Sequence, residues 1–103
     1  MNEKEFALRL SKLRTKKNVS AREMSLDIGQ NPNYINHIET GQGLPSLTGL
    51  SYICEYLGIS ISEFFNYEIE NPAKLHSVNE LLSKLNDEQL DMIEKLIKGL
   101  IKK

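Results

Sequence analysis

The sequence predicts an all-α protein that consists of a five-helix domain followed by a C-terminal helical extension. Apolar residues recur at three- and four-residue steps, and nowhere do apolar and polar residues alternate for long enough to predict a strand. Glycines that end predicted helices are soon followed by Ser or Asn residues that can cap new ones. We place the domain at residues 1–68 and the extension at residues 69–103.

The first two helices are predicted from their apolar faces and their caps. Glu3–Lys17 carries its apolar residues on one face, and its basic residues, Arg9 among them, are expected mostly on another. Ser20 is the expected N-cap of the second helix, and Glu23 is expected to complete a capping box. Gly29 is expected to end this helix, because glycine adopts left-handed backbone angles at little steric cost.

A third helix is predicted from Asn31, as N-cap, and Pro32, as the first helical residue, through to Thr40. Two short helices joined by a glycine-containing turn indicate a helix-turn-helix unit at residues 20–40. If Ile35 and Ile38 face the core, then the polar residues between and before them face outward.

Two more helices are expected to complete the domain. Ser46 is the predicted cap of the fourth helix, whose expected buried stripe is Leu47, Leu50, Ile53, Cys54 and Leu57. Ser60 and Glu63 form a predicted capping box for a short fifth helix, which should bring Phe64 and Phe65 to the core.

The chain beyond a predicted linker at residues 67–72 reads as two amphipathic helices, and Asn86 to Gln89 should cap the second. Their apolar positions are Leu75, Val78, Leu81, Leu82 and Leu85, and then Leu90, Ile93, Leu96, Ile97, Leu100 and Ile101. These stripes are too large to leave in water, so we expect them to pack on the domain, on each other or on a second copy of the chain. Folding back and homodimerisation remain equal alternatives.

The composition excludes several classes of protein. Cys54 is the single cysteine, so we exclude a disulfide framework and a multi-cysteine zinc site and expect a small core residue. His37 and His76 have no further ligands at metal spacing, so neither predicts a metal site. No catalytic or phosphate-loop motif is found, so we expect neither enzymatic activity nor a cofactor. Without a secretory signal or an apolar run of ~18 residues, we expect a soluble, cytoplasmic protein with no membrane partner.

The formal net charge is −1, but the charges are unevenly distributed. Residues 1–22 contain seven basic and two acidic residues, whereas residues 23–70 contain seven acidic residues and no lysine or arginine. Because only the local field acts on a docked partner, this split can give one face a positive edge. The alternative is that these are ordinary solvated faces.

A series of short motifs runs in order from Phe6 to Phe65, over more than half of the chain. It comprises Leu13-Arg14, Ser20-x-x-Glu23-Met24-Ser25, Ile28-Gly29, Ile35-x-x-Ile38-Glu39-x-Gly41, Leu44-Pro45-Ser46, Leu50 to Leu57, and Gly58-Ile59-Ser60-x-x-Glu63-Phe64-Phe65. Together these motifs resemble the lambda repressor and Cro type of helix-turn-helix regulators, also called the xenobiotic-response-element family. The resemblance implies a five-helix, lambda repressor-like DNA-binding domain.

The resemblance also implies roles for individual residues. The third helix should enter the major groove, and Arg14 should form a structural pair with Glu39. Asn33 and His37 fall at base-reading positions, where an asparagine can bridge adenine at two points. The other expected contacts lie nearer the phosphates. The full expected set of DNA-binding residues is Lys16, Lys17, Arg22, Gln30, Asn31, Asn33, Tyr34, Asn36, His37 and Gln42.

Two features depart from the family's pattern. Ala21 stands where many relatives carry glutamine, which removes a usual contact to DNA, and the third helix has no lysine or arginine. We therefore expect modest, salt-sensitive binding of double-stranded DNA.

The function predicted is that of a sequence-specific transcriptional regulator, a repressor that binds an inverted repeat as a homodimer. The alternative is a protein-interaction module, or an antitoxin whose C-terminal helices bind a protein partner, with the fold retained and little or no DNA binding.

Overall fold

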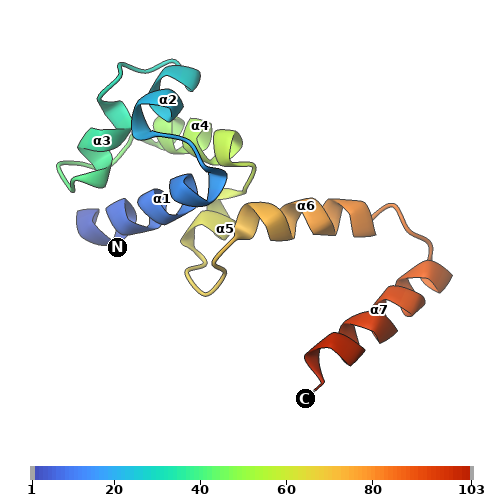
Figure 1. Cartoon of the computed structure of the whole chain (residues 1–103). Helices are drawn as coiled ribbons and strands as arrows, with labels where there is room; N and C mark the ends of the chain where they lie inside the picture. Colours follow the sequence, from blue (N-terminus) through green and yellow to red (C-terminus); the bar gives the residue numbers. More distant parts are fainter. Residues whose placement is uncertain (1, 103) are drawn as a thin grey trace. The chain divides into compact units, whose positions relative to one another are not determined.

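The computed structural model describes residues 2–102, and all regular structure in that range is helical (Figure 1). Its helices are α1 (Glu3–Lys17), α2 (Ala21–Asp27), α3 (Tyr34–Glu39), α4 (Leu47–Leu57), α5 (Ile61–Phe65), α6 (Pro72–Leu82) and α7 (Asp87–Ile101). The predicted all-α class, with five helices and a helical extension, is therefore confirmed.

The chain divides into two compact units, and the division falls inside α6, between Ala73 and Lys74. The first unit holds α1 to α5. The second holds the rest of α6 and all of α7. The expected domain boundary after residue 68 stays a prediction about which segment folds on its own.

The core of the first unit is built around α1, which packs against both α3 and α4. Its fully buried large side chains come from every helix of the unit, and they include Leu10, Met24, Ile35, Ile53 and Phe64. The ring of Phe6 stacks on that of Phe64, with centroids 4.9 Å apart. Helices far apart in the sequence therefore share one apolar core.

Two expected core residues lie outside the core. Leu47 is 77% exposed, because it is the first residue of α4 and the buried face of that helix begins only with later residues. Phe65 is 39% exposed: α5 has five residues and directs Phe64 inward, which leaves Phe65 at the edge of the aromatic cluster. By contrast Cys54 is buried as predicted, and burial raises the pKa of its thiol to about 11.

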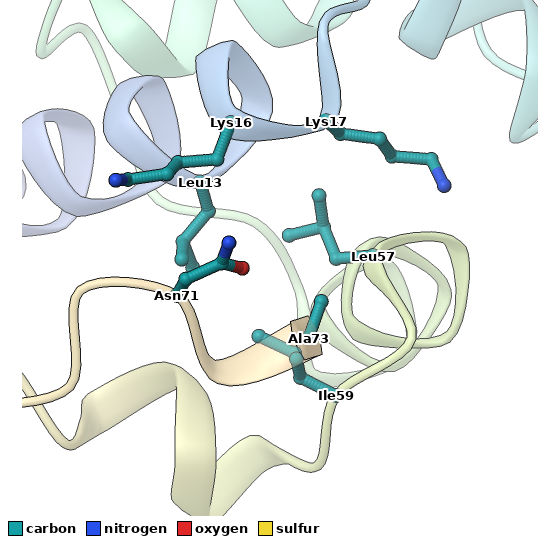
Figure 2. Close-up of a pocket in the computed structure, with 7 residues that line it drawn as sticks. All are labelled: Leu13, Lys16, Lys17, Leu57, Ile59, Asn71 and Ala73. Atoms are coloured by element: carbon teal, nitrogen blue, oxygen red, sulfur yellow. The ribbon is translucent and has the colours of Figure 1, made fainter. Parts of the chain in front are cut away.

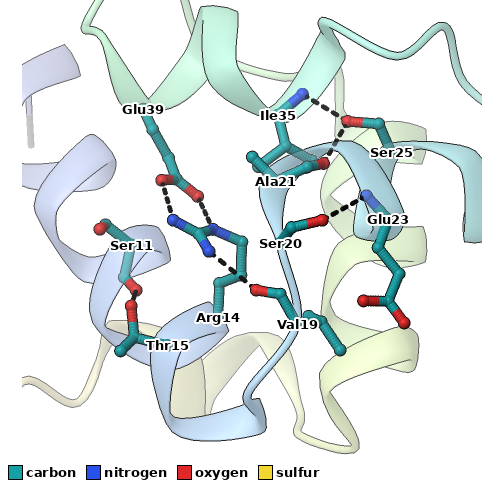
Figure 3. Close-up of polar contacts among 10 residues, drawn as sticks. All are labelled: Ser11, Arg14, Thr15, Val19, Ser20, Ala21, Glu23, Ser25, Ile35 and Glu39. Atoms are coloured by element: carbon teal, nitrogen blue, oxygen red, sulfur yellow. Dashed lines mark hydrogen bonds and ion pairs between the residues drawn. The ribbon is translucent and has the colours of Figure 1, made fainter.

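The helix caps follow the sequence in most places. Ser46 caps α4, Ser60 and Glu63 form the predicted capping box of α5, and Gly58 ends α4 in the left-handed conformation with φ +73°. At α2 the capping box is only half formed. The backbone N–H of Glu23 donates to Ser20 Oγ at 2.9 Å, but the carboxylate of Glu23 points away from Ser20 (Figure 3).

Arg9, expected on the solvated face of α1, is only 6% exposed. Its guanidinium donates hydrogen bonds to four backbone carbonyl oxygens at 2.6–3.0 Å, those of Glu63, Phe64, Asn66 and Ile69. The last carbonyls of a short helix have no partners within it, and a guanidinium carries five N–H donors in a planar fork. Arg9 therefore ties the end of α5 and the following segment, predicted to be a linker, to α1.

The second unit is less buried than the first. Asn86 and Gln89 form the predicted capping box at the start of α7, and no residue of α7 is buried. Among residues 2–102, no helix is both long and apolar enough to cross a membrane.

Substituting Arg9 tests its structural role. The Arg9→Met variant keeps an apolar side chain and removes every donor to the four carbonyl oxygens. We expect the free energy of unfolding, measured by urea denaturation, to fall by about 2–3 kcal/mol, because unsatisfied buried acceptors are costly. Lys12→Met, one turn away on an exposed position, is the matched control and should change stability by less than about 0.5 kcal/mol. Equal losses in the two variants would contradict this role.

Candidate nucleic-acid interface

The turn between α2 and α3 differs from the prediction. Asn31 does not cap the third helix: its side-chain oxygen accepts from the backbone N–H of Asn33 at 2.9 Å, and Pro32 lies in the turn that this bond closes. Asn33, with φ −98° and ψ 0°, is not helical, so α3 begins only at Tyr34. Asn33 therefore precedes the first turn of α3, and its side chain makes no capping hydrogen bond.

Ser25 fixes the start of α3 against α2 (Figure 3). Its fully buried hydroxyl donates to the carbonyl oxygen of Ala21 at 2.7 Å and accepts from the backbone N–H of Ile35 at 3.0 Å. That N–H lies in the first turn of α3, where backbone donors have no partner within the helix. One hydroxyl group therefore joins the two helices of the helix-turn-helix unit. Sequence reasoning placed Ser25 in a family motif and gave it no role.

Arg14 fixes the other end of α3. Its guanidinium donates to both carboxylate oxygens of Glu39, from Nε at 2.7 Å and from Nη2 at 2.9 Å, and its Nη1 donates to the carbonyl oxygen of Val19 at 2.8 Å (Figure 3). A bidentate, charge-assisted pair has a defined geometry as well as a favourable energy. The structural Arg14–Glu39 pair that the family resemblance implied is confirmed.

Between these two attachments, α3 turns one face inward and the other outward. Ile35 and Ile38 are buried, and Asn33, Asn36 and His37 are exposed, as their spacing predicted. The loop after α3 approaches the same face, since a Cβ on Gly43 would lie 3.6 Å from His37 Nε2. The result is a polar surface that contains no lysine or arginine, and its side chains make no structural hydrogen bonds.

Four other expected DNA-binding residues lie on segments next to α3. Arg22 and Asn31 are exposed, Gln30 is partly buried, and Gln42 is exposed, with its side-chain amide donating to Thr40 Oγ1 at 2.8 Å. They belong to α2, to the turn before α3 and to the loop after it. Gln30 and Asn31 precede α3 in the turn, Gln42 follows α3 in the loop, and Arg22 lies on α2, which packs against α3.

Tyr34 has a packing role that the sequence did not reveal. A Cβ on Gly49 would lie only 2.5 Å from the Tyr34 hydroxyl oxygen, so this hydroxyl occupies the space that the missing side chain leaves in α4. Burial raises the pKa of the Tyr34 phenol. Tyr34 therefore spans from α3 to α4, and Gly49 is required for that contact.

Lys16 and Lys17 lie in a different setting, on the last turn of α1 (Figure 2). They border a hollow of about 80 Å³ whose walls include Leu57, Ile59 and Asn71. The ammonium group of Lys17 also lies 5.0 Å from the centre of the Tyr56 ring. These lysines therefore lie beside α4 and the segment before α6, and no residue of α3 lines this hollow.

Lys4 is a cation near α3 that sequence reasoning passed over. Together with Thr40 and Gly41 it lines an open hollow of about 270 Å³ between the start of α1 and the end of α3. No motif or spacing marks Lys4, because only the packing of α1 against α3 brings the two segments together.

The contact between Tyr34 and Gly49 can be tested by a double-mutant cycle. Gly49→Ala should lower the melting temperature, because the new methyl group meets the Tyr34 hydroxyl. In the Tyr34→Phe background that oxygen is gone, so we expect the cost to shrink, with a coupling of about 0.5–3 kcal/mol. Gly99→Ala, where a Cβ meets nothing within 4 Å, is the control and should behave alike in both backgrounds. A zero coupling energy would contradict the contact.

Comparison with known proteins gives one match. A family model described as helix-turn-helix matches residues 10–64, which run from α1 to α5 and cover more than half of the chain. No curated protein and no solved structure matches the chain. The matched segment contains both attachments of α3 and its outward face. The chain therefore belongs to the lambda repressor/Cro-like helix-turn-helix family of DNA-binding regulators.

Proposed function

We propose that this protein is a cytoplasmic, sequence-specific transcriptional repressor that reads double-stranded DNA with the outward face of residues 31–40. The observation that carries the proposal is that some side chains hold α3 in place while others on its outward face are left available for binding. Its inward side and both of its ends are held by Ile35, Ser25 and Arg14, while Asn33 and His37 carry no structural hydrogen bond. A helix fixed in this way presents side chains in a preorganised geometry, which lowers the entropy cost of binding.

The outward face offers hydrogen-bond donors and acceptors that can pair with the edges of bases. The major groove shows a different pattern of donors and acceptors for each base pair, and asparagine pairs with adenine at N6 and N7. Asn33 and Asn36 each offer one acceptor and two donors, and the imidazole of His37 offers one of each when neutral. We assign base reading to Asn33 and His37, and we place Asn36 and Tyr34 nearer the phosphates.

Phosphate contacts in this proposal come from residues around the outward face. Arg22, Gln30, Asn31 and Gln42 lie on the segments next to α3, and Lys4 adds a cation at the end of α3. Lys16 and Lys17 add positive potential from the last turn of α1. Because few of these groups are charged, we expect only a small number of counterions to be released on binding, and hence a modest affinity.

We further propose that two copies act together. One helix-turn-helix unit reads only a few base pairs, whereas a two-fold symmetric pair reads an inverted repeat with half-sites about one helical turn apart. Such a dimer would repress transcription by occupying DNA that the transcription machinery needs. The extension supplies the apolar surface for pairing.

A second candidate function is that of a protein-interaction module or an antitoxin. The observation that favours it is the charge of the domain, since α3 has no lysine or arginine and residues 23–70 carry acidic groups only. In that case the domain would retain the fold with little or no DNA binding, and an antitoxin would bind its protein partner through the C-terminal helices.

The proposal is tested by titrating a fluorescent duplex from the DNA upstream of the protein's own gene with the full-length chain at low salt. Asn33→Ala and His37→Ala should each weaken binding roughly ten- to hundredfold, because each removes a base contact worth about 1–3 kcal/mol. Neither side chain has a structural hydrogen bond, so both variants should keep the wild-type melting temperature.

Ser51→Ala serves as the control and should leave binding unchanged, because Ser51 is exposed on α4 and lies two residues beyond Gly49, on the opposite side of that helix from the Tyr34 contact. If the wild-type chain binds the upstream duplex no more tightly than unrelated DNA, the repressor assignment fails and the interaction module is favoured.

A further inference from the structure

The backbone N–H groups at the start of α3 are paired within the domain. The N–H of Asn33 donates to Asn31 Oδ1 at 2.9 Å, and the N–H of Tyr34 donates to the carbonyl oxygen of Asn31 at 3.1 Å. The N–H of Ile35 donates to the hydroxyl of Ser25 at 3.0 Å (Figure 3). Backbone amides at a helix start commonly bind phosphates, but these three already have acceptors. From residue 33 to residue 35, contacts to DNA therefore come from side chains.

Asn33 is held by its backbone although it lies outside α3. Its dihedral angles, φ −98° and ψ 0°, are not helical, so helical geometry does not set the direction of its side chain. Its N–H is bound to Asn31 Oδ1, and its carbonyl oxygen accepts from the N–H of His37 at 2.9 Å. The peptide groups on both sides of the Asn33 Cα are thus fixed, one by Asn31 and one by His37.

Asn31 fixes the first of these two peptide groups. An asparagine whose side-chain oxygen accepts from the backbone N–H two residues on closes a tight turn. Pro32, inside this turn, has a nearly fixed φ and no N–H of its own. The single bond from Asn31 Oδ1 therefore restricts most of the backbone freedom that remains between Asn31 and Asn33.

We propose that Asn31 is a positioning residue for base recognition: its side-chain oxygen holds the Asn33 backbone so that the exposed Asn33 carboxamide meets a base edge. This inference rests on the base-reading role proposed above for Asn33. It gives the two ends of the Asn31 carboxamide different roles. Oδ1 holds the turn, while Nδ2, which the turn does not use, is available for the phosphate contact proposed for Asn31.

The position of the Asn33 backbone matters because an asparagine reads a base with two atoms at once. A carboxamide that pairs with adenine must meet N6 and N7 together. A rotation of the peptide group before Asn33 moves the whole side chain, so both bonds are lost together. A phosphate contact carries no sequence information, and losing one weakens binding to every sequence alike. The two roles of Asn31 therefore have different consequences for binding.

Amide hydrogen exchange in the free full-length chain tests the turn. In Asn31→Ala the Asn33 N–H loses its acceptor and should exchange about three- to tenfold faster, as expected for the loss of one hydrogen bond. The Ile35 N–H, which Ser25 holds, is the internal control and should keep its rate. Asn31→Asp keeps an acceptor oxygen and should keep the slow exchange of Asn33. An Asn33 rate that is equal in the wild type and in Asn31→Ala would overturn the inference.

A double-mutant cycle in DNA binding tests the positioning role itself. The upstream duplex is titrated at low salt with the wild type, Asn31→Ala, Asn33→Ala and the double variant. The loss caused by Asn31→Ala should be about three- to tenfold larger in the wild-type background than in the Asn33→Ala background, where no base-reading side chain is left to misplace. A phosphate contact, or a loss of fold stability, costs the same in both backgrounds and cancels.

Two control variants complete the cycle. Asn31→Asp keeps the turn, and the charge that it adds near phosphates should weaken binding by the same factor with and without the Asn33 side chain. Gln42→Ala removes another exposed amide, in the loop after α3, and should be additive with Asn33→Ala. Melting temperatures check that each variant keeps the fold. Equal losses from Asn31→Ala in the two backgrounds would overturn the inference.

The outcomes distinguish this role from the proposed function. Specific binding by the wild type with additive losses in the cycle refutes the positioning role and leaves the DNA-binding function in place. A wild-type chain without specific binding refutes the proposed function and this role with it.

Discussion

The bidentate bond between Arg14 and Glu39 is the interaction on which the proposed DNA-binding surface depends. α3 has six residues, and an isolated helix of that length has little stability in water. Its position must therefore come from its surroundings. Arg14 attaches the end of α3 and the connection before α2 to α1, and Ser25 attaches the start of α3 to α2. Tyr34 adds a third contact, to α4.

Structural contacts and the proposed base contacts belong to different side chains in this domain. Arg9 and Arg14 have structural roles. Arg9 donates its hydrogen bonds to backbone carbonyl oxygens, and Arg14 donates to Glu39 and to one backbone carbonyl oxygen. The outward side chains of Asn33 and His37 make no structural hydrogen bond of this kind. Substitutions at outward positions can therefore change what the surface recognises while the fold is kept, which is how one scaffold hosts many specificities.

Local signals predicted much of the fold, and long-range contacts account for what was missed. The caps at Ser46 and Ser60 depend on residues three positions apart, so the sequence reveals them. The burial of Arg9 depends on carbonyl groups more than fifty residues away, and the approach of Lys4 to α3 depends on helix packing. Asn31 was assigned to a helix start because an Asn-Pro pair is typical there, but the same side chain can close a turn. The outward face of α3 was predictable from the spacing of its isoleucines. The DNA-binding role of that face rests on the family.

The central claim is that α3 is held in a fixed position and reads DNA as part of a dimer. The most direct test is to let the purified full-length chain select bound duplexes from a random pool. The enriched sequences should form an inverted repeat with half-site centres about 10–10.5 base pairs apart, and selection with Asn33→Ala should lose preference at a base pair in each half-site. A pool that remains random after repeated selection at low salt would contradict the account.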